Sequence, residues 1–278
     1  MTVDAHLHLW NPGRVAYPWL MTAPGPIRRT FAFTEVEPQL EQAGIDRVVL
    51  VQGANSLEDS TAMFEVAAEH DRVAGVVAWV DLLDPALTIA QLDRWAVNPS
   101  FVGVRHLIHD EPDPDWLGRN EVRESLTLLA DRGLTFDVIS ALPRHLEHAL
   151  ALAEELPGLR LVIDHLGTPP VGAANAEQWR TLMTELAAHP NVFAKLSGLT
   201  TLGPSGRANA RELQPYVDHA IKAFGPPRLL YGGDWPVSTL AGPYSETWAI
   251  ANELVQPLST SERSEVFINT AVAAYRLR

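Results

Sequence analysis

The sequence predicts an α/β protein folded as a single (β/α)8 TIM barrel, and three observations support this prediction. Short runs rich in Val, Ile and Leu alternate with longer segments of helical period along nearly the whole chain. Eight such pairs fit in 278 residues, close to the roughly 250 residues typical of this barrel. Runs such as 48–51 and 73–79 are apolar without alternation, which is typical of parallel strands covered by helices on both faces.

Each apolar run predicts one strand, and each segment of helical period predicts one helix. The expected strands are 2–9, 47–53, 73–82, 101–108, 134–139, 160–166, 192–199 and 229–234. The expected helices are 34–43, 56–70, 85–98, 120–132, 142–156, 175–189, 211–224, 245–253 and 260–275. Gly44 and Gly133 fit left-handed C-caps, Ser56 fits an N-cap, and Pro85 fits the first turn of a helix.

A doubly wound open sheet is the alternative architecture. Such a sheet normally carries a glycine-rich first turn that binds phosphate. Here the first turn reads Asn11-Pro12-Gly13-Arg14, which lacks that pattern, and no organic cofactor is expected. The chain shows no linker, internal repeat or low-complexity segment, so residues 1–278 are expected to form one domain.

Composition restricts the classes of partner and site. The 21 basic and 34 acidic residues give a net charge of −13, which argues against nucleic-acid and membrane-surface partners because both need a basic face. The absence of cysteine excludes disulfides, thiolate metal sites and a cysteine nucleophile. No transmembrane run or signal peptide is recognisable, so we expect a cytoplasmic protein, and a homo-oligomer is compatible with this composition.

The first predicted strand ends in a His-x-His motif. Strand period places His6 and His8 on one face, with Cα atoms about 6.6 Å apart. Two imidazoles so placed can share one cation, whereas the alternative is two separately satisfied polar side chains. Burying both rings on an inward face requires partners, which favours a shared function at the carboxyl end of the strand, where barrels carry their chemistry.

Two later strands also end in side chains that can do chemistry. His165 ends the sixth strand, and Asp234 ends the eighth directly after two glycines that allow close approach of backbone or ligand. Taken singly, a lone histidine is weak evidence and a strand-end aspartate is more often a cap or turn residue. Joined with the first-strand histidines around one barrel mouth, Asp234 is predicted to be a general base or a ligand.

Cationic and aromatic side chains are expected around the same mouth. A buried inward Lys or Arg is unfavourable unless it is paired or faces a polar ligand, so Arg105 and Lys195 are expected either in structural ion pairs or against the substrate. The acidic loop 110–115 is predicted to be a solvated turn, because it lacks the glycine and spacing of a calcium loop. An aromatic wall for a small ring is predicted from Trp10, Trp19, Trp116 and Trp235.

A family resemblance is carried by motifs that follow one another along nearly the whole chain. Residues 3–10 (VDAHLHLW) and 17–20 (YPWL) resemble the start of amidohydrolase-related proteins of the sugar-lactonase type. Further motifs that resemble the same group lie at residues 103–106, 110–117, 142–146, 164–167, 195–199 and 233–236. The ordered set is specific for the family and less specific for a substrate.

This resemblance implies a barrel enzyme that hydrolyses lactones, above all aldonolactones such as L-fucono-, L-rhamnono- or galactonolactone. The family's catalytic positions map onto His6, His8, His165 and Asp234, and Asp234 would act as the general base that directs water at the ester carbonyl. The expected substrate contacts are Arg105, His106, His109, His145, Lys195, Trp19 and Trp235.

The chain departs from the two-metal members of the wider superfamily. Those proteins use a Lys on the fourth strand and a His on the fifth, where this sequence offers Arg105 and the histidine-free segment 135–139. A two-metal centre is therefore not expected. Two arrangements stay open, namely a site without metal and a site with one divalent cation, zinc, held by His6, His8, His165 and Asp234.

Two other functions stay open at this point. A metal-dependent decarboxylase of the same barrel superfamily would use a similar set of residues, would contain stoichiometric metal and would release CO2. A non-catalytic binding protein would show a broken site. Each expected polar position is filled in this sequence, and the sugar-lactonase motifs favour hydrolysis.

Overall fold

The computed structural model describes residues 1–173 and 175–278, and it confirms the predicted barrel. Eight strands pair in parallel in chain order, and a parallel bridge between Leu7 and Trp235 joins the end of the last strand to the first. The strands are β1 (Val3–Leu7), β2 (Arg47–Val51), β3 (Val73–Ala78), β4 (Phe101–His106), β5 (Thr135–Val138), β6 (Arg160–Ile163), β7 (Val192–Leu196) and β8 (Leu229–Tyr231).

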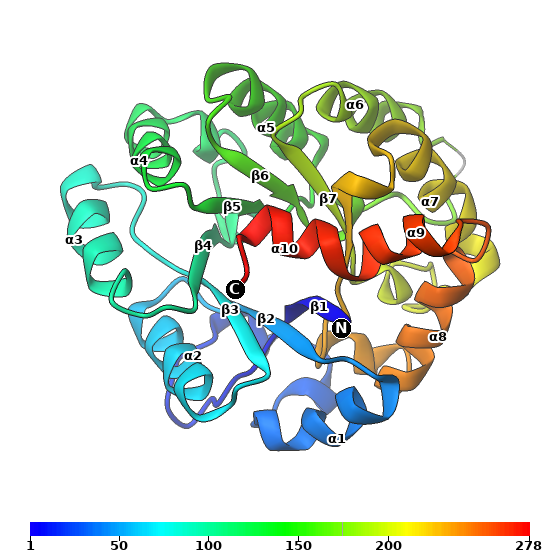
Figure 1. Cartoon of the computed structure of the whole chain (residues 1–278). Helices are drawn as coiled ribbons and strands as arrows, with labels where there is room; N and C mark the ends of the chain where they lie inside the picture. The colour runs from blue at the N-terminus through cyan, green and yellow to red at the C-terminus, as the bar shows by residue number, and fades with distance from the viewer. Residues whose placement is uncertain (174) are drawn as a thin grey trace.

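Helices surround the strands as an outer ring (Figure 1). The ring contains α1 (Phe33–Ala43), α2 (Leu57–Glu69), α3 (Pro85–Trp95), α4 (Asn120–Asp131), α5 (Pro143–Glu155), α6 (Glu177–Ala187), α7 (Ala210–Phe224) and α8 (Tyr244–Leu254), and they are followed by α9 (Thr260–Ser264) and α10 (Thr270–Tyr275). The expected caps are confirmed at Gly44, which has a left-handed φ of 71°, and at Ser56, whose side chain accepts from the backbone of Asp59.

The strands end one to four residues earlier than the apolar runs predicted. The sixth shows why, because the prediction carried it to residue 166. After Ile163 the backbone turns, and His165 and Leu166 adopt positive φ values of 55° and 50°. The polar residues at the strand ends therefore lie in loops at the barrel mouth. The predicted last helix is also interrupted, because a π-helical turn at Glu265–Asn269 separates α9 from α10.

The C-terminal helix α10 closes the barrel at the end where the strands begin. Figure 1 shows α10 lying across the barrel, with both chain termini beside it. Ala271, Ala274 and Tyr275 of this helix pack with side chains inside the barrel. These inward side chains are Val3, Ala5, Val49, Val51, Val77, Val102, Val162, Phe193 and Leu230. The carboxyl ends of the strands are left as the face available to a ligand.

A second apolar shell lies between the strands and the outer helices. The outward side chains Val48, Leu50 and Val76 are fully buried there, as are Leu40 of α1 and Leu92 of α3. Because both faces of these strands are buried, their sequences are apolar without alternation. Within the described ranges, no helix is long and apolar enough to cross a membrane.

Candidate active site

Four buried charged side chains form a layer inside the barrel, between the apolar floor and the mouth. Lys195 Nζ lies 2.7 Å from Asp137 Oδ2 and 2.9 Å from Asp164 Oδ1. Arg105 Nη1 lies 2.9 Å from Asp164 Oδ2. The four side chains come from β4, β5, β7 and the turn after β6, so the layer ties together half of the barrel. Two cations thus face two carboxyl groups in the buried interior of the barrel.

The protonation of the two carboxyl groups differs. Burial alone would raise the pKa of Asp164, but the charges of Lys195, His6 and Arg105 hold that pKa well below its ordinary value. Burial raises the pKa of Asp137 to about 6, although the Lys195 ammonium opposes this shift. Asp164 is therefore the firm anion of the layer.

The first-strand histidines meet a carboxylate at the barrel mouth. The Nε2 atoms of His6 and His8 lie 3.0 Å apart, and Asp234 Oδ1 lies 3.7 Å and 3.4 Å from them. A bulge in β1 between Asp4 and Leu7 changes the pairing with β2 just where this motif begins. The three ligand atoms face one small space.

The second nitrogen of each imidazole is held from behind. His8 Nδ1 lies 2.7 Å from the carbonyl oxygen of Val51 and donates to it, which leaves Nε2 unprotonated in the neutral ring. His6 Nδ1 lies 3.0 Å from Lys195 Nζ and 3.3 Å from Asp164 Oδ1. Burial lowers the pKa of His6 well below its ordinary value, so this imidazole is neutral.

His165 stands next to this group. Its ring centroid lies 4.7 Å from that of His6, and its Nδ1 atom lies 2.9 Å from Ser197 Oγ. The ligand atoms group in two sets, His6 with His8 and Asp234, and His6 with Asp164 and His165. The structure therefore brings all four predicted residues together, but His165 shares a set with Asp164 rather than with His8 and Asp234.

Close approach of these side chains requires glycine at residue 198. A Cβ atom there would lie 2.5 Å from His165 Nδ1 and 2.9 Å from Asp234 Oδ2, and the residue has a φ of 62°. His165 and Asp234 themselves have positive φ values of 55° and 54°. Such strain is unfavourable and tends to gather at functional sites.

A cavity of about 220 Å³ opens onto this group. Asp234, His8 and His165 form part of its wall, together with Arg105. Other lining residues are Trp10, Trp19, Gly53, Leu107, His109, Ile139 and Val237. One side of the cavity is thus polar and titratable, and the other is aromatic and aliphatic. The predicted contacts Arg105, His109 and Trp19 lie in the wall.

The structure places four other predicted contacts away from the wall of this cavity. Lys195 lies in the buried charge layer, and Trp235 is buried with its ring against Phe31. His106 stacks on Trp116 at 4.0 Å between centroids, which also keeps that tryptophan out of the predicted aromatic wall.

Hydrogen bonds hold His106 in that position and also fix the ring of His145. Trp79 donates to His106 Nδ1 at 3.1 Å, and Glu111 Oε1 lies 2.8 Å from His106 Nε2. His145, in the first turn of α5, accepts from the backbone of Ala141. Both rings thus serve contacts within the loops around the mouth.

Sequence reasoning assigned no role to Asp164 and Asp137. Asp164 directly precedes His165, and Asp137 interrupts the apolar fifth strand at an inward position. An inward Lys such as Lys195 requires a buried counter-charge. The two acids in or next to the predicted strands could therefore have been identified from the sequence as its partners.

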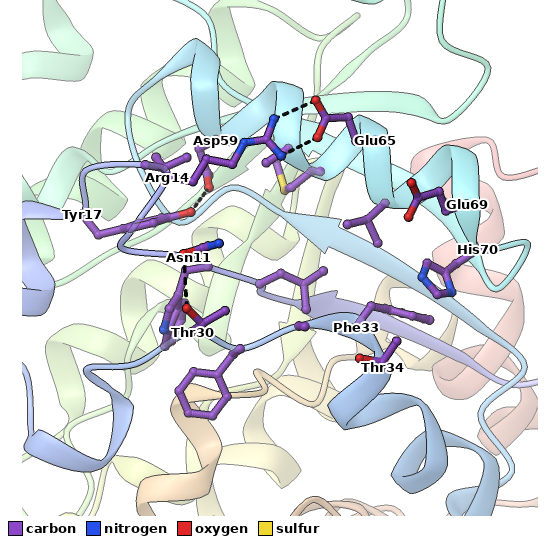
Figure 2. Close-up of a pocket in the computed structure, with 18 residues that line it drawn as sticks. Asn11, Arg14, Tyr17, Thr30, Phe33, Thr34, Asp59, Glu65, Glu69 and His70 are labelled. Atoms are coloured by element: carbon purple, nitrogen blue, oxygen red, sulfur yellow. Dashed lines mark hydrogen bonds and ion pairs between the residues drawn. The ribbon is translucent and has the colours of Figure 1, made fainter.

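A larger cavity of about 370 Å³ lies on the other side of Trp10, which lines both. Figure 2 shows that several of its labelled polar groups bond to one another. Arg14 pairs with Glu65, and Tyr17 donates to Asp59 at 2.6 Å. The smaller cavity, which exposes His8, His165 and Asp234, is therefore the better candidate for chemistry.

Replacing Gly198 with alanine is expected to lower the free energy of unfolding by about 1–3 kcal/mol, because the site combines a positive φ with atoms in the way of a Cβ. Gly158→Ala is the matched control, since a Cβ there meets nothing within 4 Å, and it should stay within about 0.5 kcal/mol of wild type. Denaturant titration measures both. Equal stability of the two variants would contradict this account of the site.

Comparison with known proteins places the chain among a defined set of relatives. The amidohydrolase family model matches residues 3–277. The chain is 37% identical to an L-fucono-1,5-lactonase of Burkholderia ambifaria, covering 99% of this chain and 95% of the relative. It is 29% identical to an L-fucono-1,5-lactonase of Burkholderia multivorans, covering 100% and 96%. A solved amidohydrolase structure from Burkholderia multivorans with bound zinc matches with a TM-score of 0.93 and 30% identity over 100% of both chains.

Proposed function

This chain belongs to the amidohydrolase family, and on that premise we propose that it hydrolyses sugar lactones by attack of water on the ester carbonyl of an aldonolactone. The observation that carries the proposal is the Asp234 carboxylate facing the paired His6 and His8 nitrogens at a small cavity. The two L-fucono-1,5-lactonases among the full-length relatives support this substrate class, and they favour it over the decarboxylase alternative.

Asp234 is the proposed general base. Its side chain is 5% exposed, reaches the cavity and lies beside neutral His6. The carboxylate takes a proton from a cavity water as the water oxygen bonds to the lactone carbonyl carbon. The ring C–O bond then breaks, and the proton passes to the leaving alkoxide, so lactone and water give one hydroxy acid. Proton transfer by a positioned side chain typically contributes about 10²–10⁴ in rate.

Arg105 and His165 are the proposed donors to the developing negative charge on the carbonyl oxygen. Arg105 lines the cavity and is fixed by Asp164 at 2.9 Å and by the carbonyl oxygen of Gln52. His165 is fixed by Ser197 Oγ at its Nδ1 atom. Donors that are already oriented stabilise such charge without reorganisation, and removing one typically costs about 3–4 kcal/mol of transition-state stabilisation.

The residues at the mouth also fit one zinc ion. His8 Nδ1 donates to Val51, so in the neutral ring Nε2 is the nitrogen left to bind a metal, and the ligand atoms of His6, His8 and Asp234 lie 3.0, 3.4 and 3.7 Å apart. Tetrahedral zinc with bonds of about 2.0–2.2 Å separates its ligands by roughly 3.3–3.6 Å. When bound, the ion supplies Lewis-acid polarisation of the carbonyl. The solved relative with bound zinc supports this assignment.

Asp234→Asn is expected to lower kcat/KM on a panel of aldonolactones at least about 100-fold, because the amide cannot take the proton from water. Asp113→Asn serves as the control, since Asp113 is an acid on the surface that pairs with Arg119, and it should keep wild-type turnover. Ring opening is followed by acid release in a weakly buffered assay. Near wild-type turnover by Asp234→Asn would remove it as the base.

Chelator treatment is expected to lower lactone turnover at least about tenfold, and added zinc should restore it. Metal analysis should find one equivalent of zinc in the wild-type protein and much less in His8→Ala, which lacks one ligand. Full turnover by protein free of zinc would contradict the metal assignment and leave the charge stabilisation to Arg105 and His165. Release of CO2 without ring opening would instead favour the decarboxylase.

A further inference from the structure

The C-terminal helix extends one polar group into the charge layer of the barrel. Tyr275, in the last turn of α10, is 1% exposed, and its hydroxyl donates to Asp137 Oδ2 at 2.6 Å. Lys195 Nζ lies 5.5 Å from the centroid of its ring, within the range of a cation–π contact. Tyr275 thus contacts both an acid and a base of the layer.

Asp137 and Lys195 continue this contact to His6. The same Oδ2 atom of Asp137 lies 2.7 Å from Lys195 Nζ, and Nζ lies 3.0 Å from His6 Nδ1. The result is one buried path from the Tyr275 hydroxyl to a histidine at the barrel mouth. All four side chains are fully or almost fully buried, so removing one member leaves a buried polar partner without its hydrogen bond.

The Tyr275 hydroxyl matters because Asp137 has few other partners. In the described part of the chain, Asp137 Oδ1 has no hydrogen-bond partner. The carboxyl group is therefore held through Oδ2, by Tyr275 and Lys195. Lys195 is shared, since its Nζ also lies 2.9 Å from Asp164 Oδ1. Tyr275 and Lys195 are therefore the side chains that fix the orientation of the Asp137 carboxyl group.

We propose that Tyr275 is a positioning residue for the active site. It fixes Asp137, and through Asp137 it holds Lys195, whose ammonium in turn fixes the Asp164 carboxylate that accepts from His6 Nδ1 and so orients this imidazole. This inference rests on the function proposed above for the site around His6. It gives the C-terminal helix a second role, because the helix that closes the floor of the barrel also supports the histidine at its mouth.

Tyr275→Phe tests the proposal, because it removes only the hydroxyl and keeps the ring under Lys195. We expect kcat on the lactone to fall about tenfold with KM within about twofold, and zinc affinity, measured by competition with a chelator, to fall about tenfold. The matched control is Tyr216→Phe. Tyr216 is also buried, and its hydroxyl donates to the carbonyl of Pro170 at 2.9 Å, away from the charge layer.

The control separates positioning from stability. Each variant loses one hydrogen bond of a buried tyrosine, so Tm should fall in both, whereas only Tyr275→Phe should change kcat and zinc affinity. Unchanged kcat and zinc affinity in Tyr275→Phe would overturn the proposal, as would equal losses in Tyr216→Phe. If the wild type opens no lactone, the proposed function fails, and the zinc titrations still decide the positioning role.

A double-mutant cycle with Asp137→Asn tests the path itself. Because Tyr275 is proposed to act through Asp137, adding Tyr275→Phe to Asp137→Asn should change zinc affinity less than twofold further. Additive losses would show that Tyr275 acts by another route and would overturn the path. If Asp137→Asn does not fold, the comparison of Tyr275→Phe with Tyr216→Phe decides alone.

Discussion

The compensated charge layer inside the barrel is the interaction on which the rest of the structure depends. Lys195 and Arg105 are buried where an unpaired cation would be strongly unfavourable, and Asp137 and Asp164 offset them at hydrogen-bonding distance. Because the partners come from different strands, the pairs hold those strands in one arrangement around the axis. The same layer places the charges of Lys195 and Asp164 against His6. The position of this histidine at the mouth therefore depends on the charge layer beneath it.

The barrel interior is therefore divided by depth. An apolar floor, closed by α10, supplies the burial that stabilises the fold. The charge layer above this floor positions His6. The loops above the strands hold the other groups proposed to do chemistry. His165 and Asp234 adopt positive φ there. The strain of these residues is tolerated because the surrounding barrel leaves them no alternative conformation.

The cavity at the mouth combines a polar side with an apolar wall. Leu107, Ile139 and Val237 face it together with Trp10 and Trp19, while Arg105, His8, His165 and Asp234 gather on the reactive side. In the larger cavity, which also has Trp10 in its wall, Arg14 is paired with Glu65 and Asp59 accepts from Tyr17 (Figure 2).

The sequence by itself determined the barrel and the kind of residue at its mouth. Apolar runs mark strands because a strand buried on both faces must be apolar throughout, and they overran the ends only where the chain turns into loops, as after Ile163. Strand period also placed His6 and His8 on one side, and strand ends identified His165 and Asp234.

Tertiary structure alone decided which of these residues meet. Period gives the face of a strand but not its partner across the barrel, so nothing local pairs Lys195 with Asp137, 58 positions away, or Tyr275 with the same acid, 138 positions away. For the same reason, the sequence could not show that Trp116, Trp79 and Glu111 withdraw His106 from the cavity. Those contacts exist only once the barrel has closed and brought distant strand ends together.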